Sequence, residues 1–245
     1  MESFIAHDTN YIRIIKKDDN TLIKYSPVSK DGWEKIKEKN LKSLNTPIKI
    51  ETLSQEERQN HWDLQTKIEL PYLKHHETLE YNQSLRNLTT KQLLLLMKEI
   101  IEKVKQMHKA EIYHTDLHSG NIMIDKKDIK IIDLDAVLVS NYISPENIHE
   151  EDDISFEEKI KLSKEDDKIS ILNLLLYYLK KGTFQNQMND FIDIQSLDFP
   201  KNIKKEIIAY QLGRADIDQD YYYEDIIEEL IKKGYESPKL RTRSK

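Results

Sequence analysis

Hydrophobic residues in the first seventy positions come in short runs separated by polar turns. The runs at 11–15 and 22–25 flank the polar residues 18–20, which are Asp, Asp and Asn. Because Asp and Asn tolerate left-handed backbone geometry, this spacing predicts a β-hairpin with a tight turn. Residues 47–53 and 62–70 have the same short apolar character and predict two further strands, joined by a polar run.

Apolar residues spaced three and four positions apart mark the predicted helices. One helix is predicted to begin at Ser29 or Asp31, either of which can cap it, and to end near Leu44. After Pro71 the pattern becomes mainly helical, beginning with a long amphipathic segment at 90–108. Further helices are predicted over 165–181, 201–211 and 223–233. The pattern therefore predicts a small, mostly β part followed by a larger helical part.

Composition narrows the possible functions. A length of 245 residues suits one large domain or two small lobes that share a core, and the absence of cysteine excludes disulfides and thiolate metal sites. A formal charge of −6 argues against a protein that binds nucleic-acid phosphates. The five glycines lie too far apart to form a Rossmann or Walker phosphate-binding loop.

The chain has no sequence signal for a membrane. No apolar stretch approaches the roughly 20 residues that cross a bilayer, and the first residues lack the basic flank of a signal peptide. We therefore expect a cytoplasmic location, while delivery to another cell by a route without such signals stays open.

The segment that carries the candidate chemistry contains a second predicted hairpin. Apolar residues 122–124 and 129–132 surround a polar turn, so they are expected to pair as antiparallel strands. Asn121 and Asp133 each lie six residues from Lys127 and are therefore expected to face each other at the open end. An amide oxygen beside a carboxylate suits Mg²⁺, which takes one or two carboxylates completed by water and phosphate oxygens.

A further acid lies close to this pair in the sequence. Asp116 precedes Asn121 by five residues, in a turn that contains Ser119 and Gly120. If Mg²⁺ bridges nucleotide phosphates at the hairpin, Asp116 can orient a substrate hydroxyl and accept its proton. Positioning and charge neutralisation of this kind provide most of the rate of phosphoryl transfer.

These residues carry a resemblance to a known family. The motif HTDLHSGN at 114–121, followed by DLD at 133–135, resembles the catalytic loop and metal-binding motif of the protein-kinase-like superfamily. The resemblance implies that Asp116 is the catalytic aspartate and that Asn121 and Asp133 bind magnesium. It also implies that His114 braces the loop from behind.

The resemblance extends to the rest of the nucleotide site. Lys24, within the first hairpin, is similar to the strand lysine that contacts the α- and β-phosphates of ATP. The following helix would supply its carboxylate partner, for which Glu38 is the first choice and Glu34 the alternative. The interlobe hinge, against which adenine would stack, corresponds to Pro71, Tyr72 and Leu73.

Later residues both match and depart from the family pattern. Ser144–Glu146 resembles the end of an activation segment, and Asp167 resembles the aspartate that buttresses the catalytic loop. The glycine-rich phosphate loop is absent, and residues 6–10 take its place. His118 replaces a lysine and Asp135 a glycine common in protein kinases, and both replacements resemble aminoglycoside and choline phosphotransferases.

Together these features predict an α+β, bilobal protein-kinase-like fold. The expected boundaries are an N-lobe at 1–71, a helical C-lobe at 72–234 and a disordered basic tail at 235–245. The leading functional prediction is an ATP- and Mg²⁺-dependent serine/threonine protein kinase, with ATP and a protein substrate as its partners. The alternatives are a kinase of small-molecule alcohols and a pseudokinase that acts as a binding or scaffold module.

Overall fold

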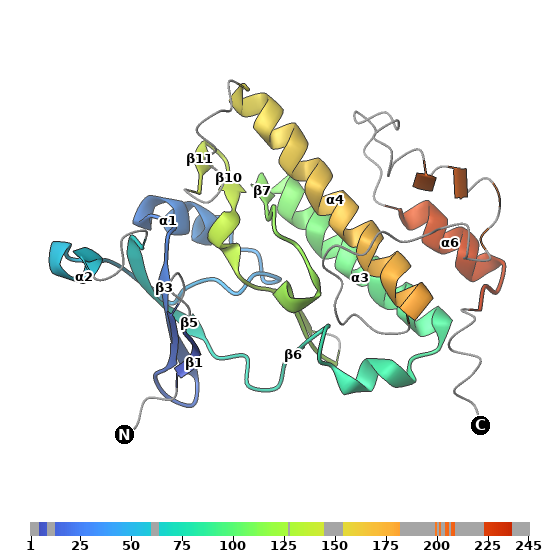
Figure 1. Cartoon of the computed structure of the whole chain (residues 1–245), viewed down its shortest axis with the longest axis horizontal. Coiled ribbons are helices and arrows are strands. Elements are labelled where there is room, and N and C mark those ends of the chain that lie inside the picture. The colour runs from blue at the N-terminus through green and yellow to red at the C-terminus, as the bar shows by residue number, and fades with distance from the viewer. Residues whose placement is uncertain are drawn as a thin grey trace.

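The computed structural model has a β-sheet-rich N-terminal region and a helical C-terminal part, so the predicted α+β class is confirmed (Figure 1). The structure describes residues 5–8, 13–59, 64–126, 128–144, 154–181, 199, 201, 204–205, 207–208 and 223–236. Within these ranges, no helix is both long enough and apolar enough to cross a membrane.

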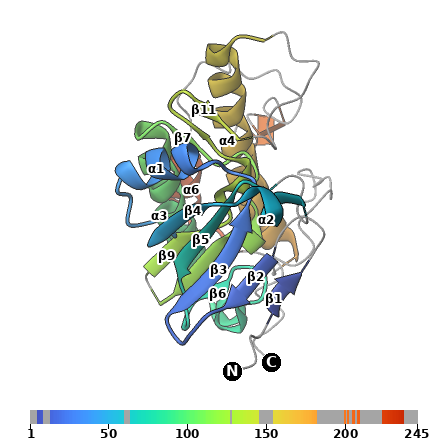
Figure 2. The ribbon, with the colours of Figure 1, turned by 90° about the vertical axis from the view of Figure 1, so that its left-hand side faces the viewer.

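The N-terminal region is built on one antiparallel sheet with the strand order β1-β2-β3-β5-β4 (Figure 2). Its strands are β1 (Ile5–Asp8), β2 (Arg13–Lys16), β3 (Thr21–Ser26), β4 (Lys49–Thr52) and β5 (Thr66–Pro71). The predicted hairpin is present as β2 and β3, and the two later strands as β4 and β5. The central strands β3 and β5 pair over their whole length, which fixes Lys24 opposite Ile68.

Helix α1 (Lys30–Glu38) is shorter than predicted. Ser29 caps it by accepting a hydrogen bond from the Gly32 backbone N–H at 3.2 Å. The helix ends before Asn40, whose φ of 50° is left-handed, and not near Leu44. Leu44 lies at a helical spacing from the buried face, but it is buried in another way, in a parallel bridge with Ile131.

The polar connection expected between β4 and β5 contains a short helix, α2 (Gln55–Gln59). Ser54 and Glu57 exchange hydrogen bonds in a capping box, with the Ser54 N–H donating to the Glu57 carboxylate at 2.9 Å and the Glu57 N–H donating to Ser54 Oγ at 3.2 Å. Hydrophobic periodicity does not predict this helix, but the Ser-x-x-Glu pattern at 54–57 is a sequence signal for its beginning.

Three helices form the main body of the C-terminal part (Figure 1). They are α3 (Thr90–Lys109), α4 (Phe156–Lys181) and α6 (Glu224–Lys232). Helix α3 buries the apolar face predicted for it and contacts both α4 and α6. Helix α4 begins nine residues before the predicted start, because its first turns are polar and carry no apolar periodicity. The helix expected at 201–211 and the tail after Glu236 fall largely or wholly outside the described residues.

Short strands join the two parts. One small sheet has the order β6-β8-β9 and the other β11-β10-β7. Their strands are β6 (Glu77–Thr78), β7 (Ile112–Tyr113), β8 (Ile122–Asp125), β9 (Asp128–Ile131), β10 (Leu138–Val139) and β11 (Tyr142–Ile143). Two backbone hydrogen bonds tie β9 to the segment that follows α1, from the Asn45 N–H to the Ile131 oxygen at 3.1 Å and from the Ile131 N–H to the Ser43 oxygen at 2.7 Å.

The register of the β8–β9 hairpin differs by one residue from the expected one. Asp125 pairs with Asp128 and Ile122 with Ile131, so the Ile132 N–H donates to the Asn121 oxygen at 3.0 Å. Asn121 is therefore opposite Ile132 and not opposite Asp133. Asp133 follows the strand with a left-handed backbone, at φ 62°, which interrupts the strand geometry at this position.

Candidate functional site

A cavity of about 140 Å³ lies between the N-terminal sheet and the β8–β9 hairpin. The predicted hinge residues Pro71, Tyr72 and Leu73 line it, as do Lys24 and Asp133. Its other lining residues are Ile14, Leu22, Trp33, Asn45, Leu70, Met123, Ile132 and Leu134. The cavity is therefore mainly apolar with one charged end, as a site for a flat ring that carries a charged group requires.

The hinge backbone is partly committed to other hydrogen bonds. The Tyr72 N–H donates to the Asn20 oxygen at 2.7 Å, and the Pro71 oxygen accepts from Asn45 Nδ2 at 3.4 Å. The Leu73 oxygen accepts from the His76 N–H at 3.0 Å. Among the described residues, the Leu73 N–H has no hydrogen-bond partner, so it can serve as a donor to a ligand.

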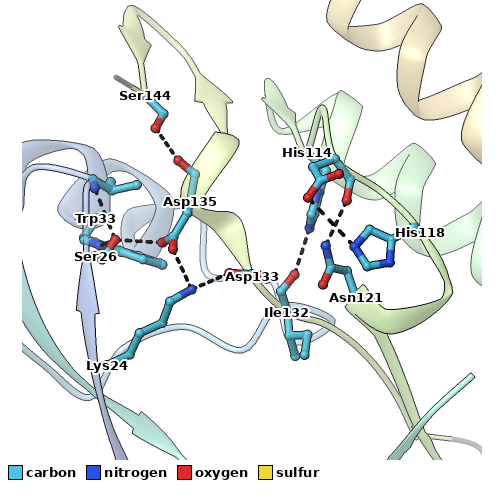
Figure 3. A network of polar contacts seen from close by, with 12 residues as sticks. Lys24, Ser26, Trp33, His114, His118, Asn121, Ile132, Asp133, Asp135 and Ser144 are labelled. Carbon is cyan, nitrogen blue, oxygen red and sulfur yellow. Dashed lines mark hydrogen bonds and ion pairs between the residues drawn. The ribbon is translucent and has the colours of Figure 1, made fainter. Parts of the chain in front are cut away.

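At the charged end, Lys24 forms an ion pair with each of two aspartates (Figure 3). Its Nζ lies 2.8 Å from Asp135 Oδ2 and also donates a hydrogen bond to Asp133 Oδ1. Lys24 and Asp135 side chains are each only 4% exposed, whereas Asp133 is 35% exposed. Ser26 donates to the other oxygen of Asp135 at 2.7 Å. We call Lys24, Ser26, Asp133 and Asp135 the anchor cluster.

Opposing effects set the protonation of the anchor cluster. Burial alone would lower the pKa of Lys24, but the charges of Asp135 and Asp133 outweigh it and raise that pKa. Burial alone would raise the pKa of Asp133, but the charge and hydrogen bond of Lys24 hold it below its usual value. Burial raises the pKa of Asp135 despite Lys24, and the negative charge of Asp133 adds to the effect. Lys24 therefore remains an ammonium ion beside an ionised Asp133.

The helix carboxylates expected to pair with Lys24 lie elsewhere. Glu38 is exposed to solvent, and Glu34 is half-exposed and pairs with Lys30 at 3.7 Å. Helix α1 presents Gly32, Trp33 and Ile36 to the interior instead. The prediction that Glu38 or Glu34 is the partner of Lys24 is wrong. The buried face of α1 is apolar, and Lys24 pairs with Asp133 and Asp135 instead.

The catalytic-loop motif follows β7 and is held from behind by a buried carboxylate. Asp167 of α4 is fully buried and accepts hydrogen bonds from the backbone N–H groups of His114 at 2.8 Å and Thr115 at 2.9 Å. His108 Nε2 lies 2.9 Å from the same carboxylate. Thr115 has a left-handed φ of 65° and its hydroxyl donates to the Ala136 oxygen at 2.6 Å. These contacts fix the backbone immediately before Asp116.

His114 connects the loop to the hairpin. Its side chain is fully buried, and its Nε2 lies 2.8 Å from the Ile132 oxygen, which can only accept. The proton is therefore on Nε2. Because Ile132 immediately precedes Asp133, this bond ties the catalytic loop to the backbone that carries the predicted metal ligand.

The side chain of Asp116 faces solvent and is 58% exposed. His118 Nε2 lies 3.8 Å from Asp116 Oδ2, and His118 Nδ1 accepts a hydrogen bond from the Gly120 N–H at 3.0 Å. A side chain at residue 120 would collide with this ring, since a Cβ there would lie 2.8 Å from His118 Cε1. Glycine at this position therefore allows the ring to stay beside Asp116.

Asn121 and Asp133 carry the two kinds of oxygen, amide and carboxylate, that Mg²⁺ takes as ligands. Asn121 Nδ2 donates to the Asp116 oxygen at 2.9 Å, so the amide oxygen is left as a possible ligand. Asp133 is ionised and partly exposed at the cavity wall. In Figure 3, Asp133 lies between the Lys24–Asp135 pair and Asn121. The described residues contain no group of three or more His, Asp or Glu that could hold a metal ion.

Some predicted features fall on residues whose structure is not described. Residues 9–10, in the segment that replaces the glycine-rich loop, are among them, as are Pro145 and Glu146. Ser144 is described: it is fully buried and its hydroxyl donates to the Asp135 backbone oxygen.

Two parts of the site were not predicted from the sequence. The first is Ser26, which supports Asp135, and the second is the pairing of Asp135 with Lys24. The signal for both is Asp135, the second acid of the DLD motif at 133–135, which stands where glycine is usual. The resemblance to small-molecule kinases does not reveal which residue it pairs with.

Comparison with known proteins agrees with this geometry. The sequence model of the protein kinase domain matches residues 23–152. Among solved structures, the chain is similar to the Drosophila melanogaster PAN3 pseudokinase, with a TM-score of 0.52 and 11% sequence identity. The similarity covers 91% of this chain and 64% of the other, so this chain spans less than two thirds of that structure. No curated protein sequence matches the chain significantly.

Proposed function

Because the chain belongs to the protein kinase family, we propose that it is a phosphotransferase that uses ATP and Mg²⁺ to phosphorylate a protein serine or threonine. The observation that carries the proposal is the position of Lys24 and Asp133 at one end of an apolar cavity, with the loop that carries Asp116 linked to the same hairpin through His114. We also propose that 1–71 and 72–234 act as the two lobes around the nucleotide.

The cavity suits the nucleotide. Leu22 and Met123 supply apolar surface for the adenine ring, and the Leu73 N–H is available to hydrogen-bond its edge. Lys24, which stays charged, would contact the phosphates. Asn121 and Asp133 would hold Mg²⁺, which neutralises phosphate charge when it is bound.

Asp116 is the candidate for the acid–base group. Its exposed carboxylate can accept the proton of a serine or threonine hydroxyl as the hydroxyl oxygen attacks the γ-phosphorus and the bond to ADP breaks. His118, fixed by Gly120, presents Nε2 toward the same carboxylate. The backbone hydrogen bonds to Asp167 keep the loop in position for this step.

A nucleotide-binding pseudokinase is the second candidate. It is supported by the similarity to a pseudokinase structure and by the absence of glycine at 6–10, where close backbone approach to phosphates usually requires it. Lys24, Asp116, Asn121 and Asp133 together argue against it, since a pure scaffold has no chemical need for the complete set.

The deciding experiment is incubation with γ-labelled ATP and Mg²⁺ in three reactions: the protein alone, the protein with generic protein substrates, and the protein with aminoglycosides and choline. We expect acid-stable label on serine or threonine of protein, and no label with Asp116→Asn. Label on a small molecule would replace the protein-kinase proposal by the small-molecule one. No transfer, together with a melting temperature raised by ATP and Mg²⁺, would favour the pseudokinase.

A further inference from the structure

We propose that Asp135 is the positioning residue that holds Lys24 toward the ATP phosphates, in place of a carboxylate from helix α1. The proposal rests on the proposed function in that it takes the cavity to be a nucleotide site. It concerns a residue that the resemblance to protein kinases does not assign, since glycine usually stands at this position.

Asp135 is itself held rigidly. Its Oδ1 accepts from the Ser26 hydroxyl at 2.7 Å, and its backbone oxygen accepts from the Ser144 hydroxyl. Ser26 Oγ in turn accepts from Trp33 Nε1 and from the Val28 N–H, both at 3.2 Å. Figure 3 shows this chain of contacts running from Trp33 through Ser26 to Asp135 and Lys24. A carboxylate fixed on both sides can define the position of the ammonium group next to it.

Asp133 cannot perform the same task once the site is occupied. Its side chain is 35% exposed at the cavity wall, and its oxygens are the ones proposed to bind Mg²⁺. Asp135 is 4% exposed and therefore closed to a hydrated cation. Of the two carboxylates that pair with Lys24, Asp135 is the one that stays with the lysine when the nucleotide is bound.

Helix α1 contributes to this arrangement only through Trp33. Its two candidate carboxylates, Glu34 and Glu38, face solvent, and Trp33 reaches the lysine indirectly, through Ser26 and Asp135. The charge that orients Lys24 therefore comes from the same three-residue motif as the predicted metal ligand. Lysine and metal site would consequently be positioned together.

The test compares Asp135→Asn with the matched control Glu38→Gln, each of which removes one negative charge from a candidate partner of Lys24. The readouts are kcat, KM for ATP, and the affinities for ATP and for adenosine measured by calorimetry. We expect Asp135→Asn to lower kcat about 100-fold, the order of loss caused by misplacing a catalytic group by about 1 Å. ATP should bind about 10-fold more weakly while adenosine, which has no phosphates, binds as before. Glu38→Gln should leave every value within about twofold.

Equal behaviour of Asp135→Asn and Glu38→Gln in an active protein would overturn the proposal. So would a parallel loss of ATP and adenosine binding, because that result indicates general damage to the cavity. If the wild type transfers no phosphate but Asp135→Asn still weakens ATP relative to adenosine, the role of Asp135 stands and only the proposed activity fails.

A second variant covers the case in which Asp135→Asn does not fold. Ser26→Ala removes the hydroxyl that fixes Asp135 Oδ1 while it leaves the ion pair intact. We expect it to weaken ATP binding about threefold relative to adenosine, a smaller effect of the same kind, because the ion pair with Lys24 is kept and only one hydrogen bond that orients the Asp135 carboxylate is lost. An unchanged ATP-to-adenosine ratio in Ser26→Ala would then count against the proposal.

Discussion

The anchor cluster and the pair formed by Asp116 and His118 are two halves of one candidate site built under different physical conditions. Lys24 and Asp135 lie 2.8 Å apart and are almost completely buried, so their attraction acts in a medium of low polarity. Asp116 is more than half exposed and lies 3.8 Å from His118, so water screens that contact. The comparison indicates that the end proposed to bind the nucleotide is fixed by charge, whereas the end proposed to receive the acceptor is open to solvent.

The exposed half still needs a rigid support, and it has one in its backbone. The buried carboxylate of Asp167 accepts hydrogen bonds from the backbone N–H groups of His114 and Thr115. These bonds fix the loop, and the side chain of Asp116 projects from it into solvent. The position of the loop around Asp116 therefore depends on Asp167, a buried residue of helix α4, whereas the exposed carboxylate belongs to Asp116 itself. Substitutions should separate the two properties.

The largest effect is expected for Asp116→Asn, which tests whether the exposed carboxylate is needed for activity but not for the stability of the fold. We expect kcat to fall about 1000-fold, within the range usual for a general base, with the free energy of unfolding changed by less than about 0.5 kcal/mol because the side chain is exposed. Steady-state kinetics and urea unfolding measure the two quantities. Activity above one tenth of wild type, with contaminating kinases excluded, would contradict the assignment.

Asp167→Asn should do the opposite and reduce stability strongly. The amide can accept at one oxygen only, so donors now satisfied by two carboxylate oxygens would be left buried without partners. We expect a loss of about 3 kcal/mol in the free energy of unfolding, measured by urea unfolding. The neighbouring Asp166→Asn is the control and should change stability by less than about 0.5 kcal/mol, since Asp166 is exposed. Equal losses in the two variants would show that Asp167 does not support the loop.

Gly32→Ala tests how closely β11 packs on helix α1. A Cβ at this position would lie 2.5 Å from Tyr142 Cε1 and 2.8 Å from Val28 Cγ1. Overpacking of this kind costs about 1–3 kcal/mol, whereas alanine in a helix gains up to about 1 kcal/mol over glycine. We therefore expect a net loss of about 1 kcal/mol in thermal or urea unfolding.

The size of this effect should depend on Tyr142. In a Tyr142→Ala background the ring is gone, so the loss caused by Gly32→Ala should shrink to what the remaining contact with Val28 Cγ1 costs. In a Tyr142→Phe background the ring remains, so the loss caused by Gly32→Ala should persist. The hydrogen bond from the Ser29 N–H to the Tyr142 hydroxyl is absent from this background with either Gly or Ala at residue 32, so it does not affect the comparison. The same loss in all three backgrounds would rule out the ring as its cause.

The two halves of the site also differ in how far the sequence predicts them. The loop from His114 to Asn121 is local, because spacing and turn chemistry define most of its geometry, and the structure has the hairpin that follows it. The hairpin register was wrong by one residue because symmetry about a turn gives only an approximate centre. The place of Lys24 in the first hairpin was predictable, since the pairing of β2 with β3 is also local, but its functional role could be inferred only from the motif at 114–135.

The partner of Lys24 could not be found in this way. Asp133 lies 109 residues after Lys24 along the chain, and Asp135 lies 109 residues after Ser26, which donates a hydrogen bond to it. The choice between these two acids and Glu38 depends on which face of α1 is buried. The same limit explains Leu44, whose spacing fits a helix although its burial comes from β9. Periodicity identifies a residue that will be buried, but it does not identify the element that covers it.

The smallest expected effect is the pH dependence of the Lys24–Asp133 pair. Lys24 holds the pKa of Asp133 below its ordinary value of 3.8, against the effect of burial. The ion pair therefore stabilises the folded state above about pH 4, and the stabilisation is lost as the pH falls through the folded-state pKa, because the unfolded chain binds the proton first. The difference in unfolding free energy between wild type and Asp133→Asn, measured in urea without Mg²⁺ or nucleotide, should be constant from pH 7 to about pH 5 and shrink below about pH 4.

Asp166→Asn provides a control of opposite sign. Although the side chain of Asp166 remains accessible to solvent, partial desolvation by the surrounding protein, with the negative charges of Asp167 and Glu165, raises its pKa above 3.8. Ionised Asp166 therefore destabilises the folded state, and wild type should gain stability relative to Asp166→Asn as the pH falls. Slopes of opposite sign in the two variants would separate the anchor cluster from general acid unfolding, which acts on both in the same direction. Parallel slopes would mean that Lys24 does not hold Asp133 in solution, and the buried and exposed halves of the site would then not differ in the way the geometry indicates.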